Sequence, residues 1–265
     1  MSLASRLWSA LRDARYALPG QVGRVLPAPD AARLGVRLAR DGLGVTYGYF
    51  QAGDATPEAI VAAYAGLKAG PGAYLSVKAP PLGFDPARIA AIAGAGVPIM
   101  FDAHAPAQAG ATLALVEAFP GSGCVIPARW RRSLGDAERL RDSAALIRVV
   151  KGEWADPDGD PADADAAYRA VIGRLAGRRA PVAVATHDPA LAERALQVLL
   201  ASGTPCELEL LRGLPRRRCV AVARRLGVPV RIYVPFGPGW WPYAVDKALA
   251  RPYLARWWLR DWLGR

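Results

Sequence analysis

Two short segments hold the residue types with the clearest chemical potential. Residues 147–152 read Ile-Arg-Val-Val-Lys-Gly, and residues 185–189 read Ala-Thr-His-Asp-Pro. Each closes an apolar run and directly precedes a stretch that favours a helix. A parallel β-strand buries such a run and presents the residues at its carboxyl end to a ligand. Guanidinium and ammonium groups at this edge suit a phosphorylated ligand.

These segments belong to a repeating pattern that begins at Leu43. Eight apolar runs rich in β-branched residues alternate with amphipathic stretches, and three of these stretches open on a proline, which the first turn of a helix tolerates. The apolar runs are residues 44–50, 73–78, 97–103, 123–127, 146–151, 181–186, 206–211 and 228–235. The amphipathic stretches include residues 57–68, 86–95, 162–175 and 189–202. The pattern predicts a parallel sheet, and eight strands can close a barrel.

An open, doubly wound sheet is the competing fold. That fold is expected to carry a G-x-G-x-x-G turn after its first strand, whereas this chain has Tyr47-Gly48-Tyr49-Phe50 there. We therefore predict a (β/α)8 barrel of the TIM type over residues 43–265. An N-terminal helical arm over residues 1–42 is expected before it, and a C-terminal helix at its end.

The composition limits the classes of partner. The chain has 265 residues and a net charge of +11, with 34 Lys and Arg against 23 Asp and Glu. This charge favours an anionic partner such as nucleic acid, an acidic membrane surface or a phosphorylated cofactor. It can equally reflect a composition rich in Ala, Arg, Gly and Pro. Three cysteines without a Cys-x-x-Cys pair, and two histidines, predict neither a disulfide framework nor a metal site.

The ends of the chain bear on its location. The N-terminal residues lack the apolar core of a signal peptide, and no run reaches the roughly 18 apolar residues of a membrane span. We therefore expect a cytoplasmic protein. The C-terminal residues 253–263 alternate tryptophans with arginines. We expect a helix that packs on the barrel through Trp258 and Trp262, which share a face; contact with the inner surface of a membrane is the alternative. Nucleic-acid stacking is not expected, because no binding module organises these residues.

Polar side chains gather at the predicted carboxyl ends of the strands. They are Lys78, Asp102, Arg148, Lys151, Thr186, His187, Glu209 and Tyr233. The carboxyl ends of all strands in a barrel meet at one mouth, so these residues are expected to face a common site.

With these motifs in this order, the chain resembles the proline dehydrogenase family, FAD-dependent barrels that oxidise L-proline to pyrroline-5-carboxylate. The resemblance covers residues 43–252. The matching pieces are Leu-Ser-Val-Lys at 75–78, Phe-Asp at 101–102, Ile-Arg-Val-Val-Lys-Gly at 147–152, Ala-Thr-His at 185–187, Glu-Leu-Glu-Leu-Leu-Arg-Gly at 207–213, Val-Arg-Ile-Tyr-Val-Pro-Phe-Gly at 230–237 and Trp-Pro-Tyr at 241–243.

The resemblance implies a role for each residue. Arg148 and Lys151 would hold the flavin and its phosphates, and Gly152 would let the backbone approach closely; exposed strand-end cations are the alternative. Thr186 and His187 would lie along the cofactor as hydrogen-bonding groups. A purely structural role is the alternative for His187. The implied cofactor set is Arg148, Lys151, Gly152, Thr186, His187 and Glu209. The implied substrate pocket is Lys78, Asp102, Tyr233, Tyr243, Leu211 and Lys247.

The departures from the family concern the substrate more than the flavin. After Tyr243 the family places two adjacent arginines that clamp the carboxylate of proline, whereas this chain has Asp246 and Lys247. An aspartate there would repel a carboxylate, and a lysine offers only a point charge. The fourth strand ends in Pro-Ala-Arg at 127–129 instead of Gln-Ala-Tyr, and Glu209 replaces a family glutamine.

Two functions follow from these features. The first is transfer of a hydride from an amine-bearing carbon, in proline or a related cyclic amino acid or amine, to FAD, with a quinone or another acceptor taking the electrons. The second is a barrel that has lost turnover and serves as a binding or regulatory module.

Overall fold

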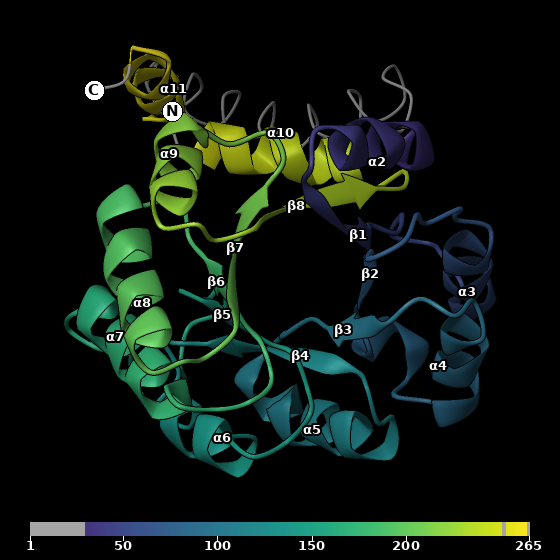
Figure 1. Cartoon of the computed structure of the whole chain (residues 1–265). Coiled ribbons are helices and arrows are strands. Elements are labelled where there is room, and N and C mark those ends of the chain that lie inside the picture. Colours follow the sequence, from purple (N-terminus) through teal and green to yellow (C-terminus); the bar gives the residue numbers. More distant parts are fainter. Residues whose placement is uncertain (1–29, 251–252, 264–265) are drawn as a thin grey trace, which may run out of the picture.

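Eight parallel strands close into a barrel in the order of the chain (Figure 1). The structure is a computed structural model that describes residues 30–250 and 253–263. The strands are β1 Gly44–Tyr49, β2 Tyr74–Val77, β3 Ile99–Phe101, β4 Gly123–Pro127, β5 Ile147–Val150, β6 Val182–Ala185, β7 Cys206–Leu211 and β8 Val230–Phe236. Pairing of β1 with β8, in parallel, closes the barrel. The predicted (β/α)8 fold is confirmed, and each strand lies within two residues of its predicted run.

A helix follows each of the first seven strands on the outside of the barrel (Figure 1). These helices are α3 Pro57–Ala65, α4 Pro86–Ala93, α5 Ala109–Ala118, α6 Ser133–Arg139, α7 Ala164–Leu175, α8 Pro189–Ala201 and α9 Arg217–Arg225, with short 3-10 turns at Pro80–Leu82 and Pro106–Gln108. The three prolines start their helices as predicted, each after a capping Thr or Asp whose side chain accepts a backbone hydrogen bond.

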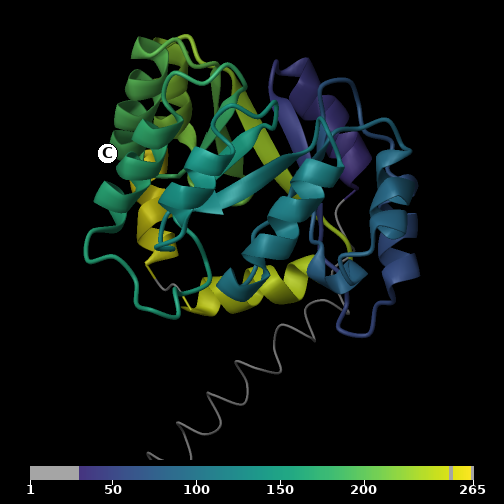
Figure 2. The same cartoon turned by 90° about the horizontal axis from the view of Figure 1, so that it is seen from below.

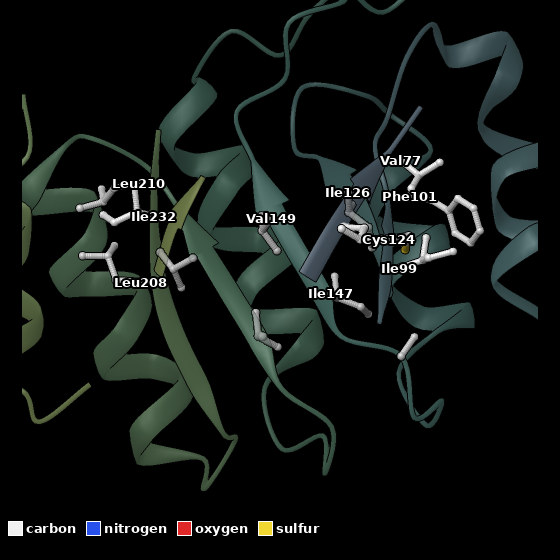
Figure 3. Close-up of a cluster of buried hydrophobic side chains, with 14 of the residues drawn as sticks. Val77, Ile99, Phe101, Cys124, Ile126, Ile147, Val149, Leu208, Leu210 and Ile232 are labelled. Atoms are coloured by element: carbon white, nitrogen blue, oxygen red, sulfur yellow. The ribbon is translucent and has the colours of Figure 1, made fainter. Parts of the chain in front are cut away.

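Alternation along each strand separates the core from the site. Ile147 and Val149 on β5, and Leu208 and Leu210 on β7, are fully buried in the hydrophobic layer between the strands and the helices (Figure 3). The residues between them therefore point to the interior of the barrel, since successive side chains of a strand face opposite sides. The interior positions carry charged groups, which the site uses.

Two helices depart from the regular alternation. After β8, α10 (Trp240–Ala250) lies across one end of the barrel (Figure 2). The flank of β1 and β8 is covered by α2 (Ala31–Arg40) instead. A side chain at Gly35 would overlap the hydroxyl of Tyr47, so glycine lets α2 pack against β1. Helix α2 lies inside the predicted arm; residues 1–29 lie outside the described residues, and the division at residue 42 stays a prediction.

The C-terminal helix α11 (Leu254–Trp262) packs on the barrel, but not through the expected tryptophans. Asp261 is buried and accepts hydrogen bonds from the backbone N–H groups of residues 216–218 at the start of α9. That anchor turns the opposite side of α11 outward, and Trp258 and Trp262 remain 46% and 67% exposed. The prediction that these two rings pack on the barrel was wrong.

Across the part of the chain that the structure describes, no helix combines the length and the apolar character that a membrane span requires.

Candidate active site

A buried ion cluster occupies the interior of the barrel. Arg148 on β5 donates from Nε and Nη2 to the two carboxylate oxygens of Glu209 on β7, at 2.7 and 2.8 Å. Its Nη1 donates to Asp102 after β3 at 3.1 Å and to the hydroxyl of Ser76 on β2 at 3.0 Å. Burial alone would lower the pKa of Arg148, but the two carboxylates outweigh it and raise that pKa. The guanidinium is therefore a fixed positive charge.

Asp102 collects donors from three further directions. It accepts from the hydroxyl of Ser76 at 2.6 Å and from that of Tyr233 at 3.3 Å, and it lies 3.9 Å from Nζ of Lys78. Lys78 also donates to the carbonyl of Tyr49 at 2.8 Å and lies 4.0 Å from the ring centre of Phe50. Burial lowers the pKa of Lys78, against the opposing effect of Asp102. The expected pairing of Lys78 with Asp102 is present.

Tyr233 packs against the side chain of Arg148 and against the backbone of β1 at Gly48. The guanidinium of Arg148 lies 5.3 Å from the centre of its ring. A side chain at Gly48 on the neighbouring strand would overlap its hydroxyl, so glycine provides the space for the phenol. Burial, and then the charge of Asp102, raise the pKa of Tyr233 well above its ordinary value. Tyr233 therefore stays a neutral phenol that can donate to Asp102.

A cavity of about 600 Å³ lies above the cluster, within the size range of small-molecule sites. The predicted residues that line it are Lys78, Asp102, Arg148, Gly152, His187, Glu209, Leu211, Tyr233 and Tyr243. Apolar and aromatic side chains, among them Phe50, Val125, Trp130, Val150 and Trp154, complete the wall. The structure thus brings most of the predicted site into one cavity.

A second cavity of about 780 Å³ adjoins the first, and Ala185, His187 and Leu214 line both. The predicted residues Lys151 and Thr186 line this second cavity. Lys151 pairs with Asp165 at 2.7 Å, but its side chain is 45% exposed, so the pair holds it only weakly. Arg256 and Arg260 of α11 also line this cavity, which is therefore rich in positive charge.

Both ring nitrogens of His187 have protein partners. Nε2 accepts from the backbone N–H of Leu211 at 2.9 Å and must be the unprotonated nitrogen; Nδ1 then donates to the carbonyl of Pro215 at 2.7 Å. Burial lowers the pKa of His187. Because both nitrogens bond to the protein, these contacts favour a structural histidine over one that bonds to a cofactor. The side chain of His187 nevertheless lines both cavities.

We expect His187 to make stability depend on pH. Its folded pKa lies below the unfolded value of 6.5, so the unfolded state binds more protons. The contribution is complete above pH 6.5 and is lost as the pH falls towards the folded pKa. His104, whose pKa burial also lowers, acts in the same direction. Urea midpoints measured between pH 7 and 5 should fall less steeply for His187→Gln, and less steeply still when His104→Gln is added. An unchanged slope in the double variant would rule this out.

Backbone conformation and close packing both require glycine at position 152. Its φ is +103°, and a Cβ there would lie 2.9 Å from side-chain atoms of Pro127 and Arg129. Arg129 also donates to the carbonyls of Gly152 and Glu153, at 3.3 and 2.8 Å. Gly152 was predicted to permit a close approach to the backbone. In this structure Pro127 and Arg129, at the carboxyl end of β4, make that close approach.

The start of α10 closes the cavity from above. The ring of Tyr243 lies 4.9 Å from that of Phe50, and its hydroxyl donates to Glu153 at 3.4 Å. Asp246 follows within one turn and is half-buried. Nothing is described of the side chain of Lys247, so that predicted site residue lies outside the described part.

Several site residues escaped the sequence analysis. Ser76 stands between two apolar residues of β2, and this alternation could have marked it as facing inward. Phe50, Glu153 and Trp154 lie in loops. Loop residues carry no periodic signal, so only the folded chain brings them to the cavity.

The sequence matches no protein-family model, but curated proline dehydrogenases are similar to it. Proline dehydrogenase from Deinococcus radiodurans is 31% identical over 49% of this chain and 44% of its own length. Proline dehydrogenase 1 from Bacillus subtilis strain 168 is 29% identical over 51% of this chain and 46% of its own length. The chain thus spans about half the length of the curated relatives that it matches.

Two solved structures share the barrel. Proline utilization A from Bdellovibrio bacteriovorus, inactivated by N-propargylglycine, superimposes with a TM-score of 0.69 at 18% identity, over 85% of this chain and 32% of that one. Proline utilization A from Corynebacterium freiburgense gives a TM-score of 0.70 at 18% identity, over 89% and 31%. At this identity they show the fold. The chain is thus similar in sequence to curated proline dehydrogenases over about half of its length, and it shares the barrel fold of these two structures.

Proposed function

We propose that the chain is a flavin-dependent oxidoreductase that removes a hydride from a carbon next to an amine nitrogen. The observation that carries the proposal is the pair of adjoining cavities at the mouth of the barrel, the first above a buried ion cluster and the second rich in cations. The names of the curated relatives support the same reaction class.

The residues present fit FAD. In the first cavity Val125, Val150 and Leu211 offer an apolar wall for a planar ring system. In the second, Lys151, Arg256 and Arg260 offer cations for a pyrophosphate. FAD, when bound, would supply the acceptor for two electrons and a proton as hydride.

The protein groups would position and polarise the reactants. Arg148 holds a fixed positive charge at the floor of the cavity, where it would stabilise negative charge that develops nearby. Asp102, which is paired with Arg148 and also lines the cavity, can accept a hydrogen bond from a substrate amine. Phe50, Trp154 and Tyr243 cover the cavity and would limit the access of water.

The substrate class is a cyclic amino acid or amine, and the electrons would pass to a quinone or another acceptor. Both assignments extend the family resemblance. Asp246, at a position where the family has an arginine, argues for a substrate other than L-proline.

One observation favours the second candidate, a barrel that binds without turnover. Four of the five N–H donors of Arg148 already bond to protein groups, so in this arrangement only the second N–H of Nη2 is left for a ligand. A purified chain that is colourless and refuses added FAD would support this candidate and overturn the flavoenzyme.

We expect the full chain to purify yellow, with a flavin absorbance band that is released on denaturation. Lys151→Ala should weaken FAD binding by about tenfold, since one charge-assisted contact to a phosphate is lost at a half-exposed site. Lys68→Ala, at an exposed lysine outside both cavities, is the matched control and should bind as the parent does. Equal FAD occupancy in the parent and in Lys151→Ala would show that Lys151 does not hold the cofactor.

A further inference from the structure

The charged side chains that line the two cavities have opposite net signs. Among the described residues, the charged groups of the first cavity are two cations, Lys78 and Arg148, and three carboxylates, Asp102, Glu153 and Glu209. Those of the second are three cations, Lys151, Arg256 and Arg260, and one carboxylate, Asp188. In a chain with a net charge of +11, the excess of carboxylates in the first cavity is a local reversal of sign. The first cavity therefore favours a cationic ligand, and the second favours an anionic one.

Both cations of the first cavity already bond to protein groups. Four of the five N–H donors of Arg148 are used in this way. Lys78 donates to the carbonyl of Tyr49 at 2.8 Å, and its Nζ lies 3.9 Å from Asp102. A carboxylate is bound best by two parallel donors, as in the fork of an arginine. The single N–H that remains on Arg148 cannot form such a fork, so a ligand carboxylate would lose its water without gaining matched donors.

The two histidines of this cavity add no positive charge. Burial lowers the pKa of His104 and that of His187 below the ordinary value, so both rings are neutral at pH 7. His187 uses both ring nitrogens for protein contacts. His104 is half-buried and lies with its ring centre 6.3 Å from that of Trp154. The carboxylates therefore set the sign of the charge in the cavity.

Aromatic rings supply a second attraction for a cation. The aromatic side chains that line the first cavity are Phe50, Trp130, Trp154, Tyr233 and Tyr243. One of these rings already binds a cation of the protein, because the ammonium group of Lys78 lies 4.0 Å from the ring centre of Phe50. The ring of Tyr243 packs beside it, with ring centres 4.9 Å apart. The face of an aromatic ring attracts an ammonium group, and it does so more strongly where water is excluded.

We propose that the first cavity binds a cyclic amine in its ammonium form and without a carboxylate, and that such amines, not cyclic amino acids, are the substrates. The preference for a cation rests on the cavity alone, whereas the reaction rests on the proposed function. In that reaction the ammonium group gives a proton to solvent, and a hydride leaves the neighbouring carbon for the flavin. The nitrogen lone pair then forms the C=N bond of a cyclic iminium. Asp246, half-buried within one turn of Tyr243, adds a carboxylate on the same side as α10.

Three cyclic probes of the same ring size test the proposal. Pyrrolidine, L-proline and cyclopentanecarboxylate are a cation, a zwitterion and an anion at pH 7. Tryptophan fluorescence of the full chain reports their binding, because Trp130 and Trp154 line the cavity. Any bound flavin is reduced beforehand, so that binding is measured without turnover. L-Proline should bind about tenfold or more weakly than pyrrolidine, since its carboxylate lacks matched donors, and cyclopentanecarboxylate should bind more weakly still. Added salt should weaken the binding of pyrrolidine.

Two variants connect this preference to the cavity. Glu153→Gln should weaken the binding of pyrrolidine by about threefold, a small effect because the side chain is exposed. Phe50→Leu should weaken it by about threefold or more, because one ring face is lost. Glu58→Gln, at an exposed glutamate outside both cavities, is the matched control for the first variant. Phe119→Leu, at a half-buried ring outside both cavities, is the control for the second.

Several outcomes would overturn the proposal. They are no binding of pyrrolidine, equal or tighter binding of L-proline or cyclopentanecarboxylate, and undiminished affinity for pyrrolidine in both cavity variants. If Phe50→Leu fails to fold, the three probes on the parent and Glu153→Gln carry the same test. The FAD content of each sample is measured separately after denaturation. A colourless chain that prefers pyrrolidine would overturn the flavoenzyme and keep the preference, and a yellow chain that prefers L-proline would do the opposite.

Discussion

Replacing Arg148 with methionine should lower the free energy of unfolding by about 3–5 kcal/mol, the usual cost of removing one partner from a buried ion pair. Glu209 would stay inside the barrel without its bidentate donor, and Asp102 would lose one of its two cationic partners among the described residues. Methionine is an uncharged side chain of similar length. The decrease in the free energy of unfolding therefore reflects carboxylates left without a cationic partner more than a cavity. Urea denaturation followed by circular dichroism measures the change.

Two comparisons separate this effect from the mere loss of an ion pair. Arg139→Met breaks an exposed pair with Glu117 and should cost far less. Adding Glu209→Leu to Arg148→Met should restore much of the stability, because replacing both members of a buried pair with apolar residues is often close to neutral. If Arg148→Met is no more costly than Arg139→Met, the ion cluster is not what holds the interior of the barrel together.

The double variant Arg148→Met/Glu209→Leu also informs the function. A folded protein that no longer retains FAD would assign the Arg148–Glu209 pair a part in holding the cofactor, separate from its part in stability. Undiminished FAD retention in that folded variant would show that the pair contributes to stability but not to holding the cofactor.

The barrel was predictable because its signals are local. Each strand is a short apolar run with its own alternation, and the helix starts carry a proline after a capping residue, as at Pro86 after Asp85 and Pro189 after Asp188. Such features depend on neighbours a few residues away. They fixed the strand bounds to within two residues without any knowledge of which strands pair.

The site was predictable in its membership but not in its contacts. The rule that strand ends meet at one mouth gathered Lys78, Asp102, Arg148 and Glu209 into one cavity. This rule did not show that Arg148 donates hydrogen bonds to Glu209, 61 residues away, and to Asp102, 46 residues away. Partners that far apart in the chain leave no pattern in the sequence between them.

For the C-terminal helix, too, the sequence predicts the element but not its contacts. Its alternation of tryptophan and arginine marks an amphipathic helix but does not say which side packs. Asp261 decides this by capping α9, whose backbone lies 43 to 45 residues earlier. A single carboxylate, paired with a distant helix start, turned the tryptophans outward.

L-Proline should be a poor substrate of this chain, and Asp246→Arg with Lys247→Arg should improve it. Asp246 lies within one turn of Tyr243, which lines the cavity, and is half-buried there. The substitution replaces a repulsive charge with planar donors that match a carboxylate. Each charge-assisted hydrogen bond contributes about 1.5–3 kcal/mol, so a gain in affinity of at least tenfold is expected.

Dye reduction by proline, with KM and kcat determined separately, measures this gain, which should appear mainly in KM if the flavin is already in place. Asp246→Ala with Lys247→Ala is the matched control: it removes the repulsion without supplying donors and should improve KM less. A gain as large in the alanine pair would mean that the arginines bind no carboxylate. An arginine pair that retains FAD but improves no cyclic amino acid would show that this turn of α10 does not face the substrate, because the donors would then be present but out of reach.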